Sequence, residues 1–175
     1  DYISMGEGAE LLADELNISR EEQEEFSFSS HEKAVAAREA GKFDNEIVPI
    51  TLEDGTIIDQ DSGPRNPDKE KIKSLNPAFR ADGTVTAATS SPFSIGASAM
   101  LITSENFANK YGLKIRAFIE GRAVAGVNWK MFGSGPVPAT KKALEKTGLS
   151  IDDIDALELN EAFAAQALYL SLIHI

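Results

Sequence analysis

Apolar residues recur at helical spacing through the first forty positions of the chain. The ranges 6–16 and 19–40 both place apolar residues three or four positions apart, which predicts two consecutive helices. Ser19 and Glu22 have the spacing of a capping box at the start of the second helix, and Gly41 is placed to end it. The first part of the chain is therefore predicted to be mostly helical.

A short alternating pattern follows these helices. Range 46–52 favours an extended segment, and range 56–58 favours a second one. Asp54 and Gly55 between them are typical of a turn, so the two segments are expected to form a hairpin. A polar loop then leads to a short helix predicted over 68–75.

The pattern changes character near residues 92–96, where we place a domain boundary. Beyond it, the ranges 113–127 and 154–159 read as strands, the first of them buried. Helices are predicted between and around them, over 104–111, 138–147 and 161–170. Alternating strands and helices indicate βαβ units with a parallel sheet, and hence an α/β fold.

Composition describes a soluble globular protein, with 175 residues, 42% hydrophobic and 26% charged. The absence of cysteine excludes a disulfide, a thiolate zinc site and a cysteine nucleophile within this chain. His31 and His174 are far apart in sequence, so no polyhistidine metal site is expected. No apolar run approaches the roughly 20 residues that span a bilayer. The chain starts without a basic, apolar leader pattern, and we expect a cytoplasmic protein.

The net charge of −11 is confined to the first third of the chain. Residues 1–55 hold 15 acidic and 4 basic residues, whereas residues 56–175 hold 13 of each. Solvated helix faces account for such a run, and an acidic surface is a poor partner for nucleic acid. A cluster of basic residues follows the acidic third of the chain, and it either binds a small phosphorylated ligand or is simply exposed to solvent. Its members are Arg65, Lys69, Lys71, Lys73 and Arg80.

Two positions carry candidate chemistry. Asn160 ends a predicted strand, where its amide would hold a water or stabilise an oxyanion, or would simply cap the next helix. Ser91, after a strand-like segment, would bond a ligand or serve as a turn residue. Range 132–138 has the glycine content of a phosphate loop but lacks its lysine and spacing.

Longer motifs resemble the thiolases, the acyl-CoA C-acetyltransferases. The motifs are GSGPVPATKKAL from Gly133, GLSIDDIDALELNEAFAA from Gly148, and NPAFRADGTVTAA from Asn76. The resemblance covers about residues 5–168 and implies an internal segment of a longer thiolase. It implies a partial, CoA-binding loop domain over 1–94, the end of the N-terminal half over 95–115 and the start of the C-terminal half over 116–170. Residues 171–175 are expected to be a non-native tail, because the sequence after Leu168 departs from the family.

The resemblance implies thiolytic cleavage of 3-ketoacyl-CoA, with CoA as co-substrate and no permanently bound cofactor. In this family a cysteine thiolate forms an acyl-enzyme, helped by a Gly-His-Pro histidine and a second cysteine. Those three groups are expected outside residues 1–175. Within the chain, Asn160 matches the residue that holds the oxyanion-hole water. The positions that match CoA or substrate contacts are Ser91, Phe79, Phe163, Met5, Ala87, Arg65 and Phe132.

Several departures keep alternatives open. Phe132 stands where a methionine often lines the acyl pocket, and Arg65 lies one residue off register. Pro92 and Ile95 depart from the family pattern near the CoA serine, which motivates a non-catalytic CoA- or lipid-binding relative as one alternative. A biosynthetic acetoacetyl-CoA thiolase is the other. The family is also expected to form a homodimer or homotetramer.

Overall fold

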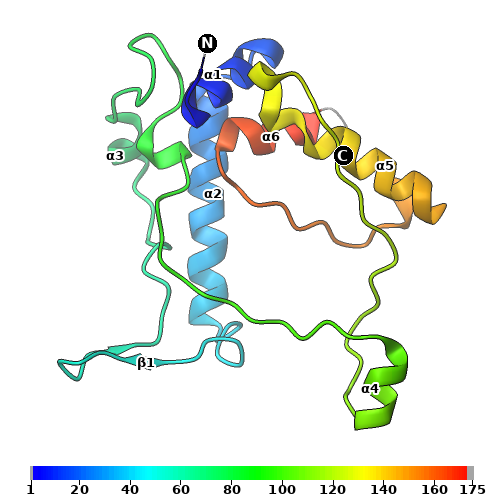
Figure 1. The fold of residues 1–175 in the computed structure, drawn as a ribbon. Helices are drawn as coiled ribbons and strands as arrows, with labels where there is room; N and C mark the ends of the chain where they lie inside the picture. The colour runs from blue at the N-terminus through cyan, green and yellow to red at the C-terminus, as the bar shows by residue number, and fades with distance from the viewer. Residues whose placement is uncertain (1, 173–175) are drawn as a thin grey trace.

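Two helices lie near the N-terminus, α1 (Met5–Leu16) at the top of the view in Figure 1 and the longer α2 (Arg20–Glu39) running down from it. The structure is a computed structural model, and it describes residues 2–172. The last helix, α6 (Ala164–Leu172), packs against both of them. A buried cluster fills the region between them; its members are Ala9, Ala13, Ile18, Val85 and Ala165.

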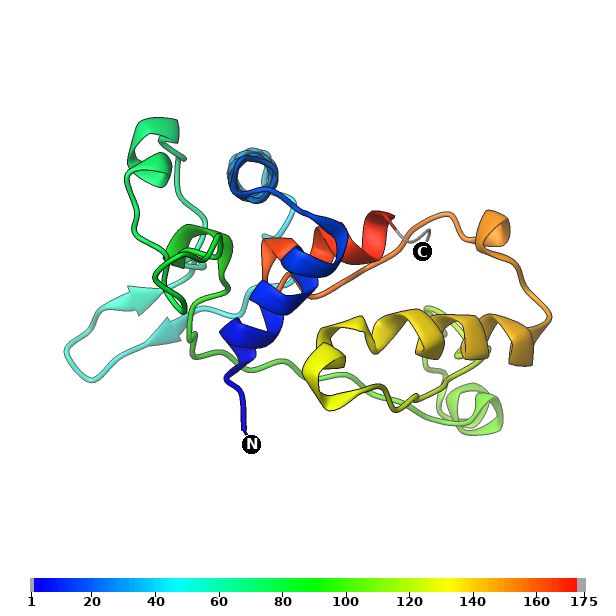
Figure 2. The same ribbon diagram turned by 90° about the horizontal axis from the view of Figure 1, so that it is seen from above.

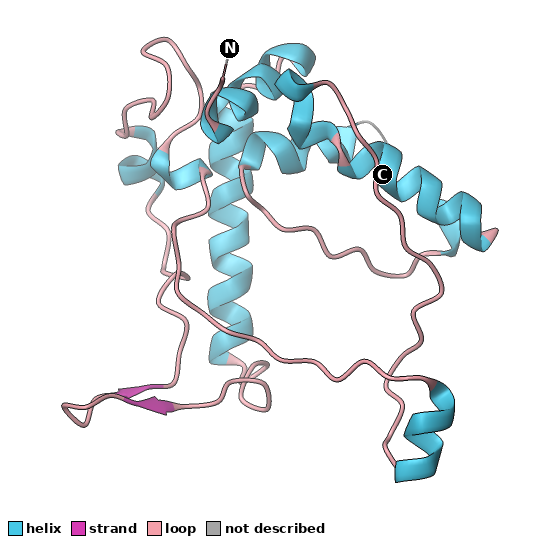
Figure 3. Ribbon diagram, in the orientation of Figure 1, coloured by secondary structure: helices cyan, strands magenta, loops and turns pink. Residues whose placement is uncertain are grey.

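Apart from α5, the remaining elements are short, and they are joined by long loops, as Figure 3 shows. They are β1 (Ile50–Thr51), β2 (Ile57–Ile58), α3 (Lys69–Lys73), η1 (Ala87–Thr89), α4 (Glu105–Tyr111), η2 (Trp129–Ser134), α5 (Pro136–Thr147) and η3 (Ile151–Asp153), where η marks a 3₁₀ helix. Figure 2 looks down the axis of α2 and shows the hairpin of β1 and β2 extending away from the helices.

Capping boxes fix the starts of both central helices. At α2 the Ser19 N–H donates to Glu22 Oε2 at 2.7 Å, and the Glu22 N–H donates to Ser19 Oγ at 3.2 Å. The capping box predicted from sequence is therefore confirmed. Ser4 and Glu7 form the same pair of bonds at α1, at 2.8 and 3.2 Å.

A buried carboxylate attaches the segment around residue 84 to α1. Glu10 is fully buried, and its carboxylate accepts the backbone N–H groups of Thr84 at 2.9 Å and Val85 at 3.1 Å. Arg80 completes the group, because it pairs with Asp14 at 2.9 Å and approaches Glu10 at 3.5 Å. A buried charge is tolerated when it is hydrogen-bonded and paired in this way.

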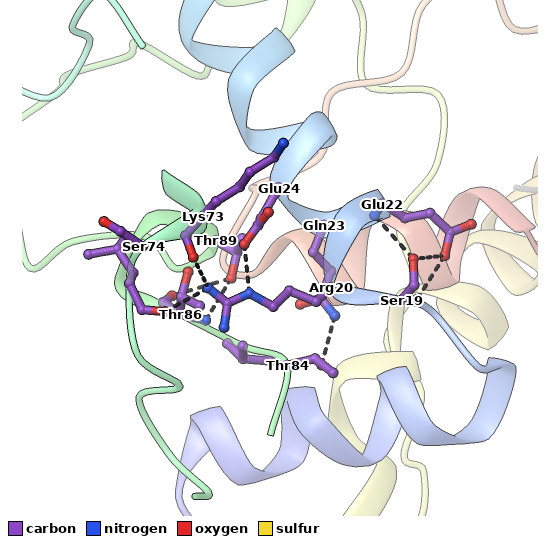
Figure 4. A network of polar contacts seen from close by, with 12 residues as sticks. Ser19, Arg20, Glu22, Gln23, Glu24, Lys73, Ser74, Thr84, Thr86 and Thr89 are labelled. Atoms are coloured by element: carbon purple, nitrogen blue, oxygen red, sulfur yellow. Dashed lines mark hydrogen bonds and ion pairs between the residues drawn. The ribbon is translucent and has the colours of Figure 1, made fainter. Parts of the chain in front are cut away.

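A second polar network joins the start of α2 to the same region (Figure 4). Arg20 Nε donates to Glu24 at 2.6 Å, and Arg20 Nη2 donates to the Lys73 carbonyl at 3.1 Å. Gln23 Nε2 donates to Thr84 Oγ1 at 2.9 Å. These contacts hold the end of α3 and the segment around residue 84 against α2.

The predicted hairpin is confirmed. β1 and β2 pair antiparallel, with Ile50 opposite Ile58 and Thr51 opposite Ile57. Gly55 sits in the connecting turn with φ of 85°, a conformation that residues with a side chain rarely adopt.

The predicted strands of the second half are not formed as sheet. Residues 113–127 and 154–159 run as extended loops, and within residues 2–172 neither pairs with another strand. The expected burial of the first segment is also wrong, since the exposed fraction is 60% for Phe118 and 83% for Val124. A strand needs a neighbour for its backbone groups, and these two segments meet none in the part of the chain described.

The later helices are close to their predicted positions. The Phe107 N–H donates to Ser104 Oγ at 3.2 Å at the start of α4. Gly112 and Gly148, with φ of 62° and 70°, follow α4 and α5, which end at residues 111 and 147 as predicted. In contrast, α6 begins at Ala164, three residues later than the predicted start at 161.

Part of the predicted tail can be placed. Ser171 and Leu172 belong to α6, whereas residues 173–175, which include His174, lie outside the described residues. Across residues 2–172, no helix combines the length and the apolar character that crossing a bilayer requires. The same residues bring no three His, Cys, Asp or Glu side chains together as a group able to hold a metal ion.

Candidate functional site

A cavity of about 890 Å³ lies between α2 and three other segments. These segments are residues 63–75, which include α3, residues 87–92, which include η1, and residues 158–164 up to the first residue of α6. The face of α2 contributes Phe26, Ser27, Ser30, His31 and Ala34. Segments far apart in the sequence therefore converge on one hollow, and its size is that of sites that hold drug- or cofactor-sized ligands.

The cavity brings together half of the predicted site residues. Arg65, Ala87, Ser91 and Asn160 all line it. The other four, which are Met5, Phe79, Phe132 and Phe163, do not contribute to this wall.

A short backbone pairing holds Ser91 beside the segment that carries Asn160. Ser90 and Phe163 form an isolated antiparallel bridge, and the Ser91 N–H donates to the Ala162 carbonyl at 2.9 Å. The two predicted polar residues therefore lie on adjoining stretches of backbone at the same cavity.

Asn160 is not a helix cap. It lies four residues before the first residue of α6, and its carbonyl accepts the Ala162 N–H at 2.9 Å in a tight turn. The capping interpretation of Asn160 is therefore wrong. Its exposed side chain, on a cavity wall, is in a position to contact a ligand.

An aromatic group lies beside the cavity, against α1. The rings of Phe79 and Phe163 meet edge to face, with centroids 6.0 Å apart. Gly6 of α1 lies against the Phe79 ring, and Gly8 lies against the Phe132 ring, so closely that a Cβ at either position would overlap the ring. Met5, the first residue of α1, is 61% exposed.

The basic cluster seen in the sequence is divided in space. Arg65 and Lys71 line the cavity. Lys69 instead pairs with Glu25 at 2.9 Å, and Lys73 lies 4.0 Å from Glu70. Arg80 pairs with Asp14, as described above. Two of the five cations therefore remain as candidates for binding an anionic ligand.

The cavity residues that the sequence did not predict include Ser30, His31 and Glu161. Ser30 Oγ donates to Glu161 Oε2 at 2.6 Å, which ties α2 to the residue after Asn160. His31 Nδ1 accepts the Arg65 N–H at 3.4 Å. Burial lowers the pKa of His31 and the positive charge of Arg65 lowers it further, while Glu161 acts in the opposite direction.

A spacing signal for these residues was present in the sequence. Ser27, Ser30, His31 and Ala34 are separated by three, one and three positions, so they share one helical face. In a helix otherwise dense in Glu, that narrow stripe of small and weakly polar residues marks a face that contacts something other than bulk water.

Two cationic side chains of the cavity are able to bind phosphate. Arg65 and Lys71 provide positive charge at one wall, and guanidinium and ammonium groups both bind phosphate oxygens. Ser91 and Asn160 provide hydroxyl and amide groups at another wall. Three carboxylates, Asp68, Glu158 and Glu161, also line the cavity, so its charge is mixed.

Two family models match consecutive parts of the chain. The thiolase N-terminal domain matches residues 1–106, and the thiolase C-terminal domain matches residues 113–173. Together these matches include every residue of the candidate site.

Curated relatives carry consistent names. The chain is 53% identical over 170 residues to a 3-ketoacyl-CoA thiolase of Vibrio parahaemolyticus, and 50% identical over 171 residues to one of Psychrobacter cryohalolentis. Each alignment covers 94% of this chain and 44% of the relative. The chain therefore spans less than half the length of the relatives that it matches.

Solved structures share the same fold. An acetyl-CoA acetyltransferase of Bacillus anthracis aligns with a TM-score of 0.95 at 44% identity, over 98% of this chain and 45% of that chain. The human mitochondrial 3-ketoacyl-CoA thiolase aligns with a TM-score of 0.94 at 39% identity, over 98% of this chain and 44% of that chain. The predicted α/β thiolase fold class is thus confirmed, and the chain belongs to the thiolase family.

Proposed function

We propose that the protein containing this chain is an acyltransferase that cleaves 3-ketoacyl-CoA with CoA, giving acetyl-CoA and an acyl-CoA shortened by two carbons. Curated relatives at about 50% identity carry the name 3-ketoacyl-CoA thiolase, which supports this direction. Such a reaction would belong to the β-oxidation of fatty acids.

One observation carries the proposal. The cavity unites Arg65, Ala87, Ser91 and Asn160 from three separate segments, and these are positions that match CoA and oxyanion contacts in thiolases. Residues that matched a family motif only by chance would not be expected to line the same ligand-sized cavity.

Each residue takes a proposed role. Ser91 and the backbone at Ala87 bond the pantetheine arm, and Arg65 binds near the adenine nucleotide. Phe79, Phe163 and Met5 contact the arm, which agrees with the edge-to-face pair of the two phenyl rings. Phe132, placed against α1, borders the acyl pocket.

The chemistry needs a thiolate that this chain does not hold, since it contains no cysteine. In the proposed reaction a cysteine thiolate adds to the 3-keto carbonyl, and the carbon–carbon bond to the acetyl unit breaks. The acetyl-CoA enolate leaves and takes a proton, and CoA thiolate then displaces the acyl group from the cysteine. Asn160 would hold the water that stabilises the oxyanion of this sequence.

Recovering the complete reading frame around residues 1–175 tests the proposal. We expect a nucleophilic cysteine, a second cysteine and a Gly-His-Pro motif in the flanking sequence. A frame without these groups would leave a CoA- or lipid-binding protein without catalysis, and the enzyme proposal would fail.

A biosynthetic activity is the second candidate. The Bacillus anthracis structure that aligns with a TM-score of 0.95 is named an acetyl-CoA acetyltransferase, and that favours condensation of two acetyl-CoA molecules. The two candidates differ in chain length: an acetoacetyl-CoA enzyme should turn over only the four-carbon substrate, whereas a degradative enzyme should accept longer chains.

The organisation of the chain belongs to the same proposal. Residues 1–94 would form part of the CoA-binding loop domain, residues 95–115 the end of the N-terminal half, and residues 116–170 the start of the C-terminal half. Acyl-CoA and CoA would be the only ligands, without a permanently bound cofactor. A cytoplasmic homodimer or homotetramer would be the working form.

A further inference from the structure

One peptide group at the cavity is held on both sides by α2. Arg38 Nη1 donates to the Pro64 carbonyl at 3.1 Å, and the Arg65 N–H donates to His31 Nδ1 at 3.4 Å. The Pro64 carbonyl and the Arg65 N–H belong to the same peptide bond. Its acceptor and its donor are therefore both satisfied by side chains of one helix.

The two side chains come from the same face of α2. His31 and Arg38 are seven residues apart, which is close to two helical turns and about 10 Å along the axis. Because a peptide group is planar, bonds to its two opposite ends fix both its position and its rotation. A loop residue held by only one bond would keep freedom to turn.

The held peptide leads directly to the Arg65 side chain. Arg65 and His31 both line the cavity, and the Arg65 charge is close enough to lower the pKa of His31. Since the Arg65 Cα follows the fixed peptide, the orientation of that peptide sets the direction in which the guanidinium leaves the backbone. A long, flexible cation in a polar loop otherwise loses rotamer entropy when it binds.

This contact requires a neutral imidazole. Only an unprotonated Nδ1 accepts a hydrogen bond, and it then leaves the proton on Nε2. Burial is the main cause that lowers the pKa of His31, followed by Arg65, so the acceptor form is present at neutral pH. Glu161 opposes this shift.

We infer that His31, together with Arg38, is a positioning residue that orients Arg65 toward the phosphate-bearing end of CoA. The inference rests on the proposed function for the identity of the ligand. It assigns to α2 a part in CoA affinity that does not involve contact between His31 and the reacting atoms.

Calorimetric titration of the full-length protein at pH 7.5 tests the inference, with CoA and pantetheine as the two probes. His31→Leu removes the acceptor and should weaken CoA binding by about fivefold, the effect of one neutral hydrogen bond. His31→Asn is the matched variant, because Oδ1 of Asn is bonded to Cγ as Nδ1 is and accepts without titrating. It should restore CoA affinity to within about twofold of the wild type. Pantetheine, which lacks phosphate, should bind all three proteins equally.

Combination with Arg65→Met separates positioning from a general loss of structure. If His31 acts through Arg65, the His31→Leu change should have no further effect on CoA affinity once Arg65 is Met. Melting temperatures recorded for each variant report whether it is folded. If His31→Leu does not fold, Arg38→Met removes the other bond of the same peptide and should give the same loss for CoA and none for pantetheine.

The outcomes are distinct. Failure of the wild-type protein to bind CoA would overturn the proposed function and this inference with it. Wild-type binding with an unchanged affinity in His31→Leu would overturn the inference alone. The inference would also be overturned if His31→Leu weakened the binding of CoA and of pantetheine equally. The same holds if His31→Leu lowered CoA affinity by the same factor whether residue 65 is Arg or Met, because His31 would then support only the local fold.

Discussion

Gly6 is required by what lies beside it rather than by its backbone conformation. A Cβ at this position would overlap the Phe79 ring, which in turn meets Phe163 edge to face. A single methyl group would therefore disturb the aromatic group that we propose for the pantetheine arm.

We expect Gly6→Ala to lower the melting temperature of the protein, by an amount equivalent to about 1–3 kcal/mol of overpacking. Thermal unfolding followed by circular dichroism measures it. Gly126→Ala is the matched control, because nothing lies within 4 Å of a Cβ there and the residue is exposed. Equal melting temperatures for both variants would contradict the contact.

Asn160 is the chain's candidate catalytic residue, now that it is known to lie outside α6. Asn160→Ala should lower kcat for thiolysis by on the order of 10²-fold with a small change in KM, because the oxyanion forms only in the reaction. Steady-state kinetics with saturating CoA measures both parameters.

Ser91→Ala provides the contrast. Loss of one neutral hydrogen bond to the arm should raise KM for CoA about fivefold and leave kcat nearly unchanged. If Asn160→Ala and Ser91→Ala changed the same parameter to the same extent, their proposed division of roles would be wrong.

Helices were the predictable elements because their signals are local. Ser19 and Glu22 lie three residues apart and make their bonds within one turn, so sequence spacing alone was sufficient to find them. The start of α6 was misplaced because the segment from Asn160 to Phe163 has helix-forming residues but is held as a turn and a bridge by Ser90 and Ser91. That constraint comes from residues about seventy positions earlier.

Glu22 gives the capping box of α2 a dependence on pH. The hydrogen bonds from Ser19 lower the pKa of this carboxyl below 4.5, its ordinary value. The folded state therefore prefers the ionised form. Its contribution to stability is complete above the unfolded pKa and is lost as the pH falls through the lower, folded pKa.

Comparison with Glu22→Gln isolates this effect, since Gln can complete a capping box but does not titrate. The wild-type protein should be the more stable of the two at pH 7, and the difference should shrink progressively below about pH 4.5. Urea unfolding across this range provides the measurement. A difference that stayed constant to pH 3 would refute the assigned cause.

Strands depend on partners, and for that reason their prediction failed where helix prediction succeeded. Range 113–127 has the apolar composition of a buried strand, yet Ile119 is 70% exposed and the segment is an extended loop. Composition indicates that a segment can be buried, whereas the neighbour that buries it must be supplied by the rest of the fold.

Only part of the candidate site could be predicted from the sequence, because the site is assembled by the whole fold. Family resemblance identified Ser91 and Asn160, and the fold places both on one cavity. Helical spacing marks the face of α2 that carries His31, but the role of His31 depends on Arg65, thirty-four positions later in the sequence. No local pattern reports a contact of that range.

Residues 1–175 expressed alone should associate. Large apolar side chains are exposed along the extended segments; among them are Phe93, Ile95, Met100, Leu101, Ile102, Phe118 and Ile119. Exposed apolar surface and unpaired extended backbone both favour self-association. Sedimentation velocity should show oligomers or aggregates, and a monodisperse monomer with a sharp thermal transition would contradict this expectation.

We propose that this chain is part of an enzyme that cleaves 3-ketoacyl-CoA with CoA as the second substrate. The most direct measurement is the initial rate of CoA-dependent cleavage by the full-length protein, over a series of 3-ketoacyl-CoA substrates from four carbons upward. We predict turnover of the longer chains, with acetyl-CoA formed in equal amount to the shortened acyl-CoA. Turnover of acetoacetyl-CoA alone would assign the biosynthetic activity instead, and no cleavage of any chain length by a folded protein that binds CoA would contradict the account.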